Sequence, residues 1–438
     1  MKVIAFESIL ATPHTETLLE LSVLHSLAGD EVIYVPAYRF VGSSPWNSPI
    51  NGDARLPRTL EAWDQYIVHL IDPFANIWVP EFVYQQFPHD WLDGSLLDAY
   101  VETATTVFYG VKGSDTVTAD IARHRTAEVA STAILTLQIL QVMINQLQPD
   151  LVYCFNGRTP SSWPLHHVSK RIGLSCIFHE RGSTMSKYAL FTKPPAYNSA
   201  WRDLYRQHRA NRDISIAKIN ASYFYRIQAS GKLKNFGYLD RNFEDSLPSF
   251  LSEDEQFVVF FCSSNVEIDT VPDQDVFFES LPNQIECIKL VKVVCKSLGL
   301  KLVIRTHPIG LDDISDVMSL DNGIDCFVIP PESKISSYLL GSRATARFST
   351  GSTIGFEMIY RGHDCGLMVR TTVSGEDGLS TTIDEDSVRD FILKAGRVAD
   401  AQNFIHFLGD FLLNYGHDYL LYNATSLHSG HIDLSKIK

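Results

Sequence analysis

The segment ARFSTGSTIGFEMIYRG, residues 346–362, contains the clearest strand–turn–helix pattern of the chain. An apolar strand is predicted to end at Phe348, and residues 349–353 form a Ser/Thr–Gly turn into a helix over 354–360. Backbone N–H groups and hydroxyls converge at such a helix start, where the helix dipole favours an anion, so the turn is a candidate phosphate site. Glu357 follows one helical turn after Thr353, where a carboxylate can accept hydrogen bonds from ribose hydroxyls. An ordinary capped helix with a solvated Glu357 explains this segment equally well when it is taken alone.

Strands and helices alternate on both sides of this segment. In the second half of the chain, apolar strands are predicted at 257–261, 301–305 and 326–330, with a helix over 282–298. In the first half, the strands KVIAF (2–6), EVIYV (31–35), LVYCF (151–155) and LSCIF (174–178) are separated by helical patterns. Such alternation predicts parallel sheets. The expected fold class is therefore α/β, with two Rossmann-like parallel-sheet domains.

Length and linker signals predict the domain organisation. A chain of 438 residues exceeds what one hydrophobic core supports, so two domains are expected. The first spans 1–245 and includes an aromatic-rich and proline-rich insertion over 38–115, which we expect to be irregular; the second spans 250–385. Residues 386–438 are expected to form helices that pack back on the first domain, by analogy with other two-lobed α/β enzymes.

The composition is that of an acidic globular protein. The net charge of -14, from 37 Lys+Arg and 51 Asp+Glu, argues against general binding to nucleic acids or to anionic membranes. The seven cysteines have no CxxC or metal-ligand spacing and are predicted to be buried free thiols in a reducing compartment. No signal peptide is visible, and polar residues interrupt the apolar stretch 131–147, so no membrane span is expected. The predicted location is the cytoplasm, and the basic helices over 201–235 leave peripheral contact with the inner face of the plasma membrane open.

Two further loops of the second half carry candidate ligand contacts. His307, in the segment RTHP (305–308), stands at the end of a strand, where it can donate to a phosphate or a sugar carboxylate. Arg305 adds a positive charge, with the alternative that the alternation of side chains along the strand points it elsewhere. An isolated histidine is more often structural, but its place one strand before the Ser/Thr turn favours a function. Ser263 and Ser264 follow the strand 257–261 as candidate phosphate or sugar contacts, and Glu267 is a candidate carboxylate. A serine-rich turn with a solvated glutamate is the alternative for this loop.

Two loops of the first half, NGR (156–158) and HERG (179–182), follow successive strands. Carboxyl ends of parallel strands meet at one edge of a sheet, where ligands bind. Glu180 is a candidate general base or nucleophile, and Arg158 and Arg181 can anchor an anionic substrate. A structural Glu–Arg pair is the alternative. His14, in the first strand–helix loop, is a candidate contact for either substrate.

Together these motifs resemble those of GT-B glycosyltransferases of bacterial capsule and lipopolysaccharide assembly. The segment STGSTIGFE (349–357) resembles the nucleotide loop of their second lobe, which implies that the turn holds phosphate and that Glu357 holds the ribose. RTHP resembles the His-Pro motif of enzymes that use CMP-activated ulosonic acids, sialic acid or 3-deoxy-manno-octulosonic acid (Kdo). NGR, HERG and the SSxxE pattern of Ser263, Ser264 and Glu267 are similar to capsule-type Kdo transferases. No nucleophilic aspartate aligns, so retention or inversion at the anomeric carbon stays open.

The resemblance implies a fold of two lobes that face a cleft. It also implies a metal-independent transferase that moves a sugar from a nucleotide donor to a surface-polysaccharide or lipopolysaccharide acceptor. Transfer of Kdo from CMP-Kdo is one such reaction. The expected catalytic residues are Glu180, Glu267 and His307; the donor-binding residues are Ser263, Ser264, Arg305, His307, Ser349, Thr350, Gly351, Ser352, Thr353 and Glu357; the acceptor-binding residues are His14, Asn156, Arg158 and Arg181. No cofactor and no metal are expected, since the CMP-, UDP- or GDP-linked sugar is a substrate and the acidic turn 269–275 is explained by solvated side chains.

The expected partners are a nucleotide-sugar donor and a glycan or glycolipid acceptor, without nucleic acid, and the oligomeric state is left open. Two other functions fit the same motifs. One is a nucleotide-sugar 2-epimerase or hydrolase on the same fold, and the other is a non-catalytic sugar-nucleotide-binding subunit.

Overall fold

The computed structural model describes residues 1–41, 60–79, 94–109, 119–229, 246–263, 281–307, 314–369, 371, 373, 381–382, 384–394, 402–426 and 429–437. The chain divides into two compact units. Unit 1 contains Met1–Ala200 and Asn414–Lys438, and unit 2 contains almost all of the chain between them. Unit 1 is therefore discontinuous in sequence.

Unit 1 is built on a seven-stranded sheet in the order β12-β6-β5-β4-β1-β2-β3. Its strands are β1 (Lys2–Phe6), β2 (Glu31–Val35), β3 (Asn76–Ile77), β4 (Leu151–Phe155), β5 (Ser175–Arg181), β6 (Lys187–Phe191) and β12 (His417–Asp418). The strands β3, β2, β1, β4 and β5 are parallel to one another, whereas β6 is antiparallel to β5 and β12 is antiparallel to β6. The chain winds outward from β1 to β3 and then resumes on the other side at β4. The strand order thus reverses between β1 and β4, as in a doubly wound sheet.

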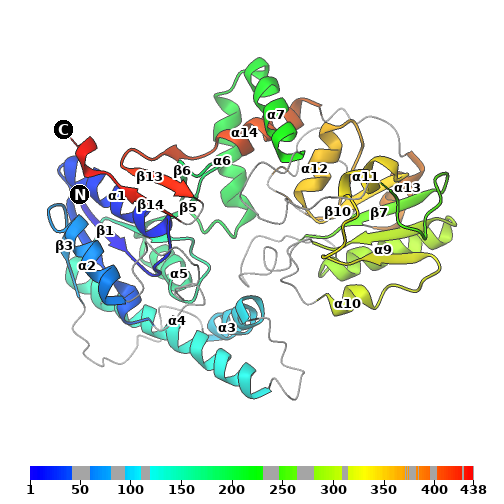
Figure 1. The fold of residues 1–438 in the computed structure, drawn as a ribbon. Coiled ribbons are helices and arrows are strands. Elements are labelled where there is room, and N and C mark those ends of the chain that lie inside the picture. Colours follow the sequence, from blue (N-terminus) through cyan, green and yellow to red (C-terminus); the bar gives the residue numbers. More distant parts are fainter. Residues whose placement is uncertain are drawn as a thin grey trace. The chain divides into compact units, whose positions relative to one another are not determined.

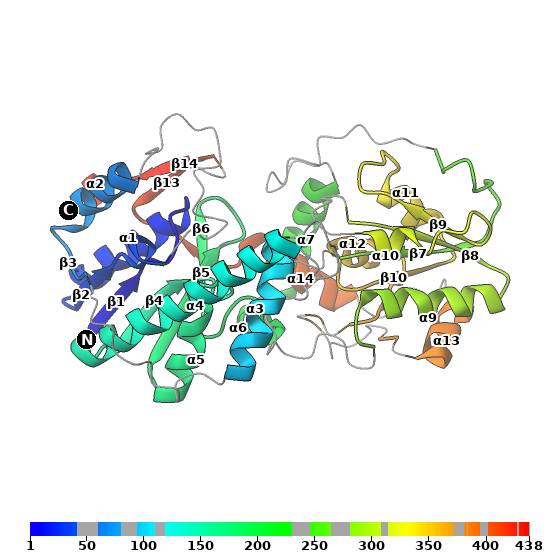
Figure 2. The same cartoon turned by 90° about the horizontal axis from the view of Figure 1, so that it is seen from below.

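Helices cover both faces of this sheet: α1 (His14–Leu27) and α2 (Leu60–Ile71) lie on one face, and α4 (Ala119–Leu147) and α5 (Trp163–Ile172) on the other (Figures 1 and 2). Leucines of α1 pack on Val3 and Ala5 of β1. Gly173, with a φ of 72°, ends α5 in the left-handed conformation that glycine adopts readily.

The prediction of an irregular insertion over 38–115 is wrong for its described parts. Helix α2 leads to β3, which pairs in parallel with β2 and extends the sheet by one strand. Helix α3 (Gly94–Tyr109) packs against α4. Residues 42–59, 80–93 and 110–118 lie outside the described residues. Apolar positions at helical spacing in α2, such as Ile67 and Ile71, are buried under the sheet and explain its formation.

The segment Arg123–Leu147 of α4 is, by length and composition alone, apolar enough to cross a membrane. It packs against α3 and α5, and Val129, Ala133, Leu137, Leu140 and Met143 are buried. These residues recur at helical spacing and form one face. The packing is that of a core helix in an α/β unit.

Unit 2 is built on a five-stranded, all-parallel sheet in the order β11-β10-β7-β8-β9. The strands are β7 (Phe257–Phe261), β8 (Lys301–Arg305), β9 (Cys326–Ile329), β10 (Ala346–Ser349) and β11 (Gly366–Leu367). The helices are α6 (Asn198–Ala210), α7 (Ile214–Ala229), α9 (Gln284–Ser297), α10 (Ser315–Met318), α11 (Ser337–Arg343), α12 (Thr353–Tyr360), α13 (Glu385–Lys394) and α14 (Gln402–Asn414). The strand order reverses between β7 and β10.

Strand β7 shows why the second sheet has helices on both faces. Val258 and Phe260 belong to a buried cluster with α9 and α13, whereas Phe257, Val259 and Phe261 belong to a cluster with α11 and α12. A continuous apolar run of this kind is typical of a strand that is buried on both faces. The predicted fold class, α/β with two Rossmann-like parallel sheets, is confirmed.

The unit boundaries differ from those predicted. Helices α6 and α7 belong mostly to unit 2, so this unit begins near Trp201 instead of at residue 250. The expectation that residues 386–438 form helices on the first domain is wrong for α13, whose Val388, Phe391 and Ile392 are buried on the second sheet. Helix α14 packs on α6 through Phe411 and Tyr205, whose ring centroids are 5.6 Å apart.

The C-terminal segment that belongs to unit 1 contains strands: β12, and a hairpin of β13 (Tyr422–Ser426) and β14 (Ser429–Ile432), followed by the 3₁₀ turn Leu434–Lys436. Glu20 of α1 holds this segment. Its buried carboxylate accepts hydrogen bonds from the backbone N–H groups of Leu420, Leu421 and Tyr422 at 2.7, 2.9 and 2.8 Å. Three backbone donors thus converge on one carboxylate and fix the segment to the helix.

Candidate functional site

The turns that follow β7 and β10 are tied together at the point where the order of the second sheet reverses. The Ser263 hydroxyl donates to the carbonyl of Thr350 at 2.9 Å, and the Ser263 N–H donates to Gln284 Oε1 at 2.8 Å. The Thr350 hydroxyl donates to the same Gln284 oxygen. All three residues are buried. In open α/β sheets the crevice at such a reversal is where ligands bind.

The start of α12 differs from those of the neighbouring helices. Asn283 caps α9 and Ser336 caps α11, each by accepting a hydrogen bond from a backbone N–H in the first turn. Ser352, at the same position of α12, makes no such bond. Ser352 and Gly351 are half-buried and Thr353 is exposed. The Ser352 N–H donates to the Ser349 hydroxyl at 2.9 Å, so the Ser352 side chain, which caps no N–H group, and the exposed Thr353 side chain are the groups that an anion at this helix start would meet.

Glu357 lies further along α12 and is 5% exposed. Burial raises the pKa of its carboxyl to about 7, although a hydrogen bond from the Tyr338 hydroxyl and the charge of Arg361 both favour the ionised form. The carboxyl lines a cavity of about 300 Å³, together with Ser222, Tyr225, Arg226, Tyr360 and Arg361. A group poised between ionised and neutral near neutral pH can accept hydrogen bonds from hydroxyls of a ligand.

His307 and Arg305 have different surroundings. Arg305 of β8 pairs in register with Phe261 of β7, so the chain leaves both strands at the same edge of the sheet and places the half-buried His307 there. Arg305 itself is buried, and its guanidinium donates to the carbonyls of Pro330 and Ser333 at 2.5 and 3.2 Å. These hydrogen bonds hold the loop after β9 in place. Arg305 thus has a structural role, whereas the sequence predicted only a contact with the donor.

Glu180 lies near the carboxyl end of β5 in unit 1. The Asn156 side-chain amide donates to Glu180 Oε2, and the Arg181 backbone N–H donates to Oε1 at 2.9 Å. His14 Nε2 stands 3.8 Å from the same Oε1, and the His14 ring lies 4.0 Å from the ring of Phe155. These contacts therefore fix the position of the carboxylate at the end of β5.

Of the predicted acceptor residues, His14, Asn156 and Arg181 thus lie at Glu180. Asn156 has a φ of 52°, a left-handed conformation that asparagine tolerates better than most residues, and this turn aims its side chain at Glu180. The Arg181 guanidinium donates to the Thr12 carbonyl at 3.2 Å, which links β5 to the loop after β1. Arg158 is half-buried, and its carbonyl accepts a hydrogen bond from Tyr100.

Two buried glutamates beside this group were missed by the sequence reasoning. Glu7 directly follows β1 and accepts a hydrogen bond from Tyr34 at 3.2 Å, and Glu16, in the first turn of α1, accepts one from Thr12 at 3.0 Å. Burial raises the pKa of Glu16 to about 7 and that of Glu7 well above its ordinary value. The position of Glu7 at the carboxyl end of the first strand was the available signal. Gln284 and Tyr338 were missed too, because only the fold brings them to Thr350 and Glu357.

Ser264 and Glu267, as well as the acidic turn 269–275, lie outside the described residues. Among the residues that are described, no group of three or more His, Cys, Asp or Glu side chains is arranged to hold a metal ion. The seven cysteines are free, and all but the half-buried Cys176 are buried.

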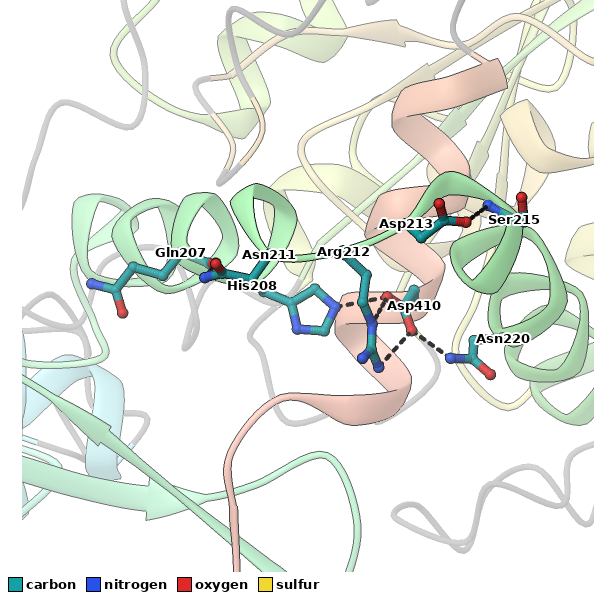
Figure 3. A network of polar contacts seen from close by, with 8 residues as sticks. All are labelled: Gln207, His208, Asn211, Arg212, Asp213, Ser215, Asn220 and Asp410. Carbon is teal, nitrogen blue, oxygen red and sulfur yellow. Dashed lines mark hydrogen bonds and ion pairs between the residues drawn. The ribbon is translucent and has the colours of Figure 1, made fainter.

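The basic stretch that we considered for membrane contact is partly engaged inside unit 2. Figure 3 shows the fully buried Asp410 of α14 receiving His208 Nε2 at 2.8 Å, Arg212 Nε at 2.7 Å and Asn220 Nδ2 at 2.7 Å. Burial alone would raise the pKa of Asp410, but these donors outweigh it and hold the pKa below its ordinary value. Asp410 therefore joins α6, α7 and α14 into one block.

No protein-family model matches the chain, and no curated protein matches it. Among solved structures, it is similar to Thermosulfurimonas dismutans KpsC, described as a beta Kdo 2,4 transferase, with a TM-score of 0.40 and 8% identity over 59% of this chain and 79% of that one. The beta Kdo 2,7 transferase of the same protein gives a TM-score of 0.36 and 12% identity over 62% and 79%. UDP-GlcNAc 2-epimerase from Neisseria meningitidis gives 0.31 and 11% over 96% of each chain. Similarities this low establish neither a shared activity nor a shared ligand.

Proposed function

We propose that the chain is a glycosyltransferase that moves a sugar from a nucleotide donor to a glycan or glycolipid acceptor of a surface polysaccharide or lipopolysaccharide. The observation that carries the proposal is the arrangement along α12 in unit 2. An uncapped helix start at the reversal of a parallel sheet is followed on the same helix by a buried glutamate that lines a cavity. Phosphate at the first and ribose at the second is the simplest ligand for this pattern.

The donor nucleotide is assigned to unit 2. In this assignment the turn 349–353 binds phosphate, Glu357 accepts hydrogen bonds from the ribose, and Ser263, Ser264 and His307 contribute from the neighbouring strand ends. The Kdo donor, linked to CMP, is the finer form of the proposal and rests on the RTHP segment. Arg305 is the weakest member of the set, because its guanidinium is already bonded to Pro330 and Ser333.

The acceptor is assigned to unit 1, around Glu180, His14, Asn156, Arg158 and Arg181. Transfer forms a bond between an acceptor oxygen and the anomeric carbon and breaks the bond from that carbon to a phosphate oxygen, while the proton of the acceptor hydroxyl passes to Glu180 as the candidate general base. Glu180, with both oxygens already accepting hydrogen bonds, is held in place to attack the anomeric carbon or to orient the acceptor. Glu267 is the second candidate carboxylate. The protein is assigned to the cytoplasm, and no metal is needed by the reaction as proposed.

A two-stage experiment tests the proposal. Thermal unfolding with CMP, UDP, GDP and their sugars identifies the nucleotide, because a ligand that binds only the folded state raises the unfolding temperature. Incubation of that donor with cell-envelope glycans, with and without EDTA, then tests transfer. Conversion of the donor without any acceptor would instead identify an epimerase or a hydrolase. Binding without any product would identify a sugar-nucleotide-binding subunit.

The variant Glu180→Gln separates catalysis from donor binding. We expect it to abolish turnover and to leave nucleotide affinity nearly unchanged, because Glu180 belongs to unit 1 and the donor residues to unit 2. Glu31→Gln is a matched control, since Glu31 is exposed at the opposite, amino-terminal end of β2. Turnover retained by Glu180→Gln would remove the catalytic role of this residue.

A further inference from the structure

Unit 2 covers one face of α7. The buried residues of this helix follow one another at helical spacing and form that inner face: Ala217, Ala221, Phe224 and Tyr225. A Cβ atom added to Gly409 of α14 would stand 2.7 Å from the Ala221 Cβ, so the two helices approach closely there. Asn220 also donates to the buried Asp410 of α14 at 2.7 Å (Figure 3). These contacts fix which side of α7 faces outward.

The opposite side of α7 is also apolar, but it is exposed. Ile216, Ile219 and Tyr223 are exposed by 47%, 70% and 48%. Their spacing of i, i+3 and i+7 places them on one side of the helix, and we call them the outer face of α7. A helix that is apolar all round is ordinarily buried. The exposure of the outer face therefore departs from what the composition of the helix predicts.

This concentration of exposed apolar side chains is specific to α7. Among the described residues, each of the other helices exposes at most one large apolar side chain, such as Val293 of α9 or Leu393 of α13. Single exposed apolar residues are common on protein surfaces, whereas a cluster of them marks an interaction surface. The outer face of α7 therefore indicates a binding partner.

The charges of α7 indicate the kind of partner. The helix contains Lys218 and Arg226 and no acidic residue. Both cations are exposed, and the Arg226 guanidinium lies 5.8 Å from the centroid of the Tyr223 ring, beside the outer face. Asp213 precedes the helix, and its carboxylate accepts a hydrogen bond from the Ser215 N–H at 2.7 Å (Figure 3). A chain with a net charge of -14 thus carries one helix whose exposed side is apolar and positive.

From these observations we propose that the outer face of α7 binds the surface of a membrane that contains anionic phospholipids. Ile216, Ile219 and Tyr223 enter the boundary between the headgroups and the acyl chains. Lys218 and Arg226 contact the lipid phosphates, which their long side chains can reach. The chain as a whole is acidic, so repulsion from the membrane disfavours contact through its other surfaces. A surface of this size gives weak and reversible binding.

A second copy of this chain fits the outer face less well. In a symmetric dimer this face would meet the same face of the other copy. Lys218 and Arg226 would then approach the cations of the second α7 helix, and neither helix offers an acidic residue to pair with them. Like charges at short distance oppose such an association. An anionic lipid surface, in contrast, satisfies both the apolar and the charged groups.

Sedimentation of the full chain with lipid vesicles tests the inference. We expect the chain to bind vesicles made of equal parts of phosphatidylcholine and phosphatidylglycerol, to stay in solution with phosphatidylcholine alone, and to be released by added salt. The double variant Ile216→Ser/Ile219→Ser should bind at least about tenfold more weakly, because two isoleucine side chains no longer leave water. Lys218→Gln should bind about fivefold more weakly.

Two matched controls lie elsewhere in unit 2. Ile324→Ser changes an isoleucine that is 75% exposed in the loop before β9, and Lys296→Gln changes an exposed lysine of α9. Both variants should bind the vesicles as the unaltered protein does. All the altered side chains are exposed, so the unfolding free energy of each variant should stay close to that of the unaltered protein. Denaturant unfolding checks this.

The other outcomes overturn the inference. If the chain does not bind the anionic vesicles, or if the double variant binds them as well as the unaltered protein, α7 is not a membrane contact. If Ile324→Ser weakens binding as much as the double variant, the outer face has no special part. A destabilised double variant would show that this face packs within the chain, and a dimer that the double variant abolishes in sedimentation velocity would show that a second copy covers it.

These results are independent of the proposed function, because neither a nucleotide nor a sugar takes part in them. Vesicle binding by a chain that transfers no sugar would support the inference and remove the proposed function. Sugar transfer by a chain that does not bind the anionic vesicles would do the reverse.

Discussion

Tyr338 of α11 donates its hydroxyl hydrogen to the buried Glu357 carboxylate of α12. Without this donor and Arg361, burial would raise the pKa of Glu357 further. Tyr338 and Arg361 therefore allow the Glu357 carboxyl to ionise near neutral pH although it is buried.

The first prediction concerns the pH dependence of stability. The pKa of Glu357 is about 7 in the folded state and about 4.3 in an unfolded chain, so its favourable contribution is complete below pH 4.3 and is lost as the pH rises through 7. Gln does not ionise, so the Glu357→Gln variant does not suffer this loss. The unfolding free energy of the variant minus that of the unaltered protein should therefore increase as the pH rises from about 5 to about 8. Urea unfolding across this range measures the difference. Equal slopes for both proteins would show that Glu357 ionises without penalty.

The second prediction separates the two threonines of the turn after β10. Thr350→Val removes a buried hydroxyl from the contacts with Ser263 and Gln284 and should cost about 1–3 kcal/mol of unfolding free energy. Thr353→Val alters an exposed side chain, so stability should change little while nucleotide affinity falls. Denaturant unfolding and nucleotide titration of both variants test the distinction. A destabilised Thr353→Val variant would contradict it.

The third prediction concerns the Asp410 network (Figure 3). Asp410→Asn leaves Arg212 and His208 without their buried carboxylate and should cost about 3–5 kcal/mol. Because the folded-state pKa of Asp410 is lowered, its contribution is present above about pH 4 and is lost as the pH falls further. Asp390→Asn, in an exposed pair with Lys394, is the control and should cost less than about 1 kcal/mol. Similar losses for the two variants would show that Asp410 does not hold the helices together.

The fourth prediction concerns the attachment of the C-terminal segment. Glu20→Gln replaces one of the two carboxylate oxygens by an amide nitrogen, which cannot accept, so at least one of the N–H groups of Leu420, Leu421 and Tyr422 loses its partner. We expect faster hydrogen exchange at these three amides and little change in β7 of unit 2. Unchanged exchange at the three amides would show that β12 alone holds the segment.

The sequence predicts what depends on local pattern. The strands 257–261 and 301–305 and the helix after the 349–353 turn form where the apolar spacing places them, since buried parallel strands and apolar helical spacing are strong local signals. Helix α2 was missed because proline-rich and aromatic-rich neighbours concealed its short amphipathic pattern.

What the sequence cannot predict are contacts between distant segments. The sequence around Glu20 predicts only a glutamate in a helix. It does not predict that this side chain binds the backbone of residues 420–422. Alternation along β8 was an available signal that Arg305 points away from a ligand, but it does not identify the partners, which are the carbonyls of Pro330 and Ser333. The sequence places the loops of Asn156 and Glu180 at one edge of the sheet, but it does not specify that the Asn156 amide donates to Glu180 Oε2. Each of these contacts joins segments that are distant in the sequence, so the local spacing of residues does not specify it.

The division of unit 1 into Met1–Ala200 and Asn414–Lys438 has a consequence for biosynthesis. When the ribosome has translated all five strands of the sheet of unit 2, it has not yet translated β12, which forms one edge of the sheet of unit 1. Unit 2, whose sheet is made of one continuous stretch, can therefore reach its final structure before residues 414–438 emerge from the ribosome, whereas the sheet of unit 1 gains β12 only after they have emerged.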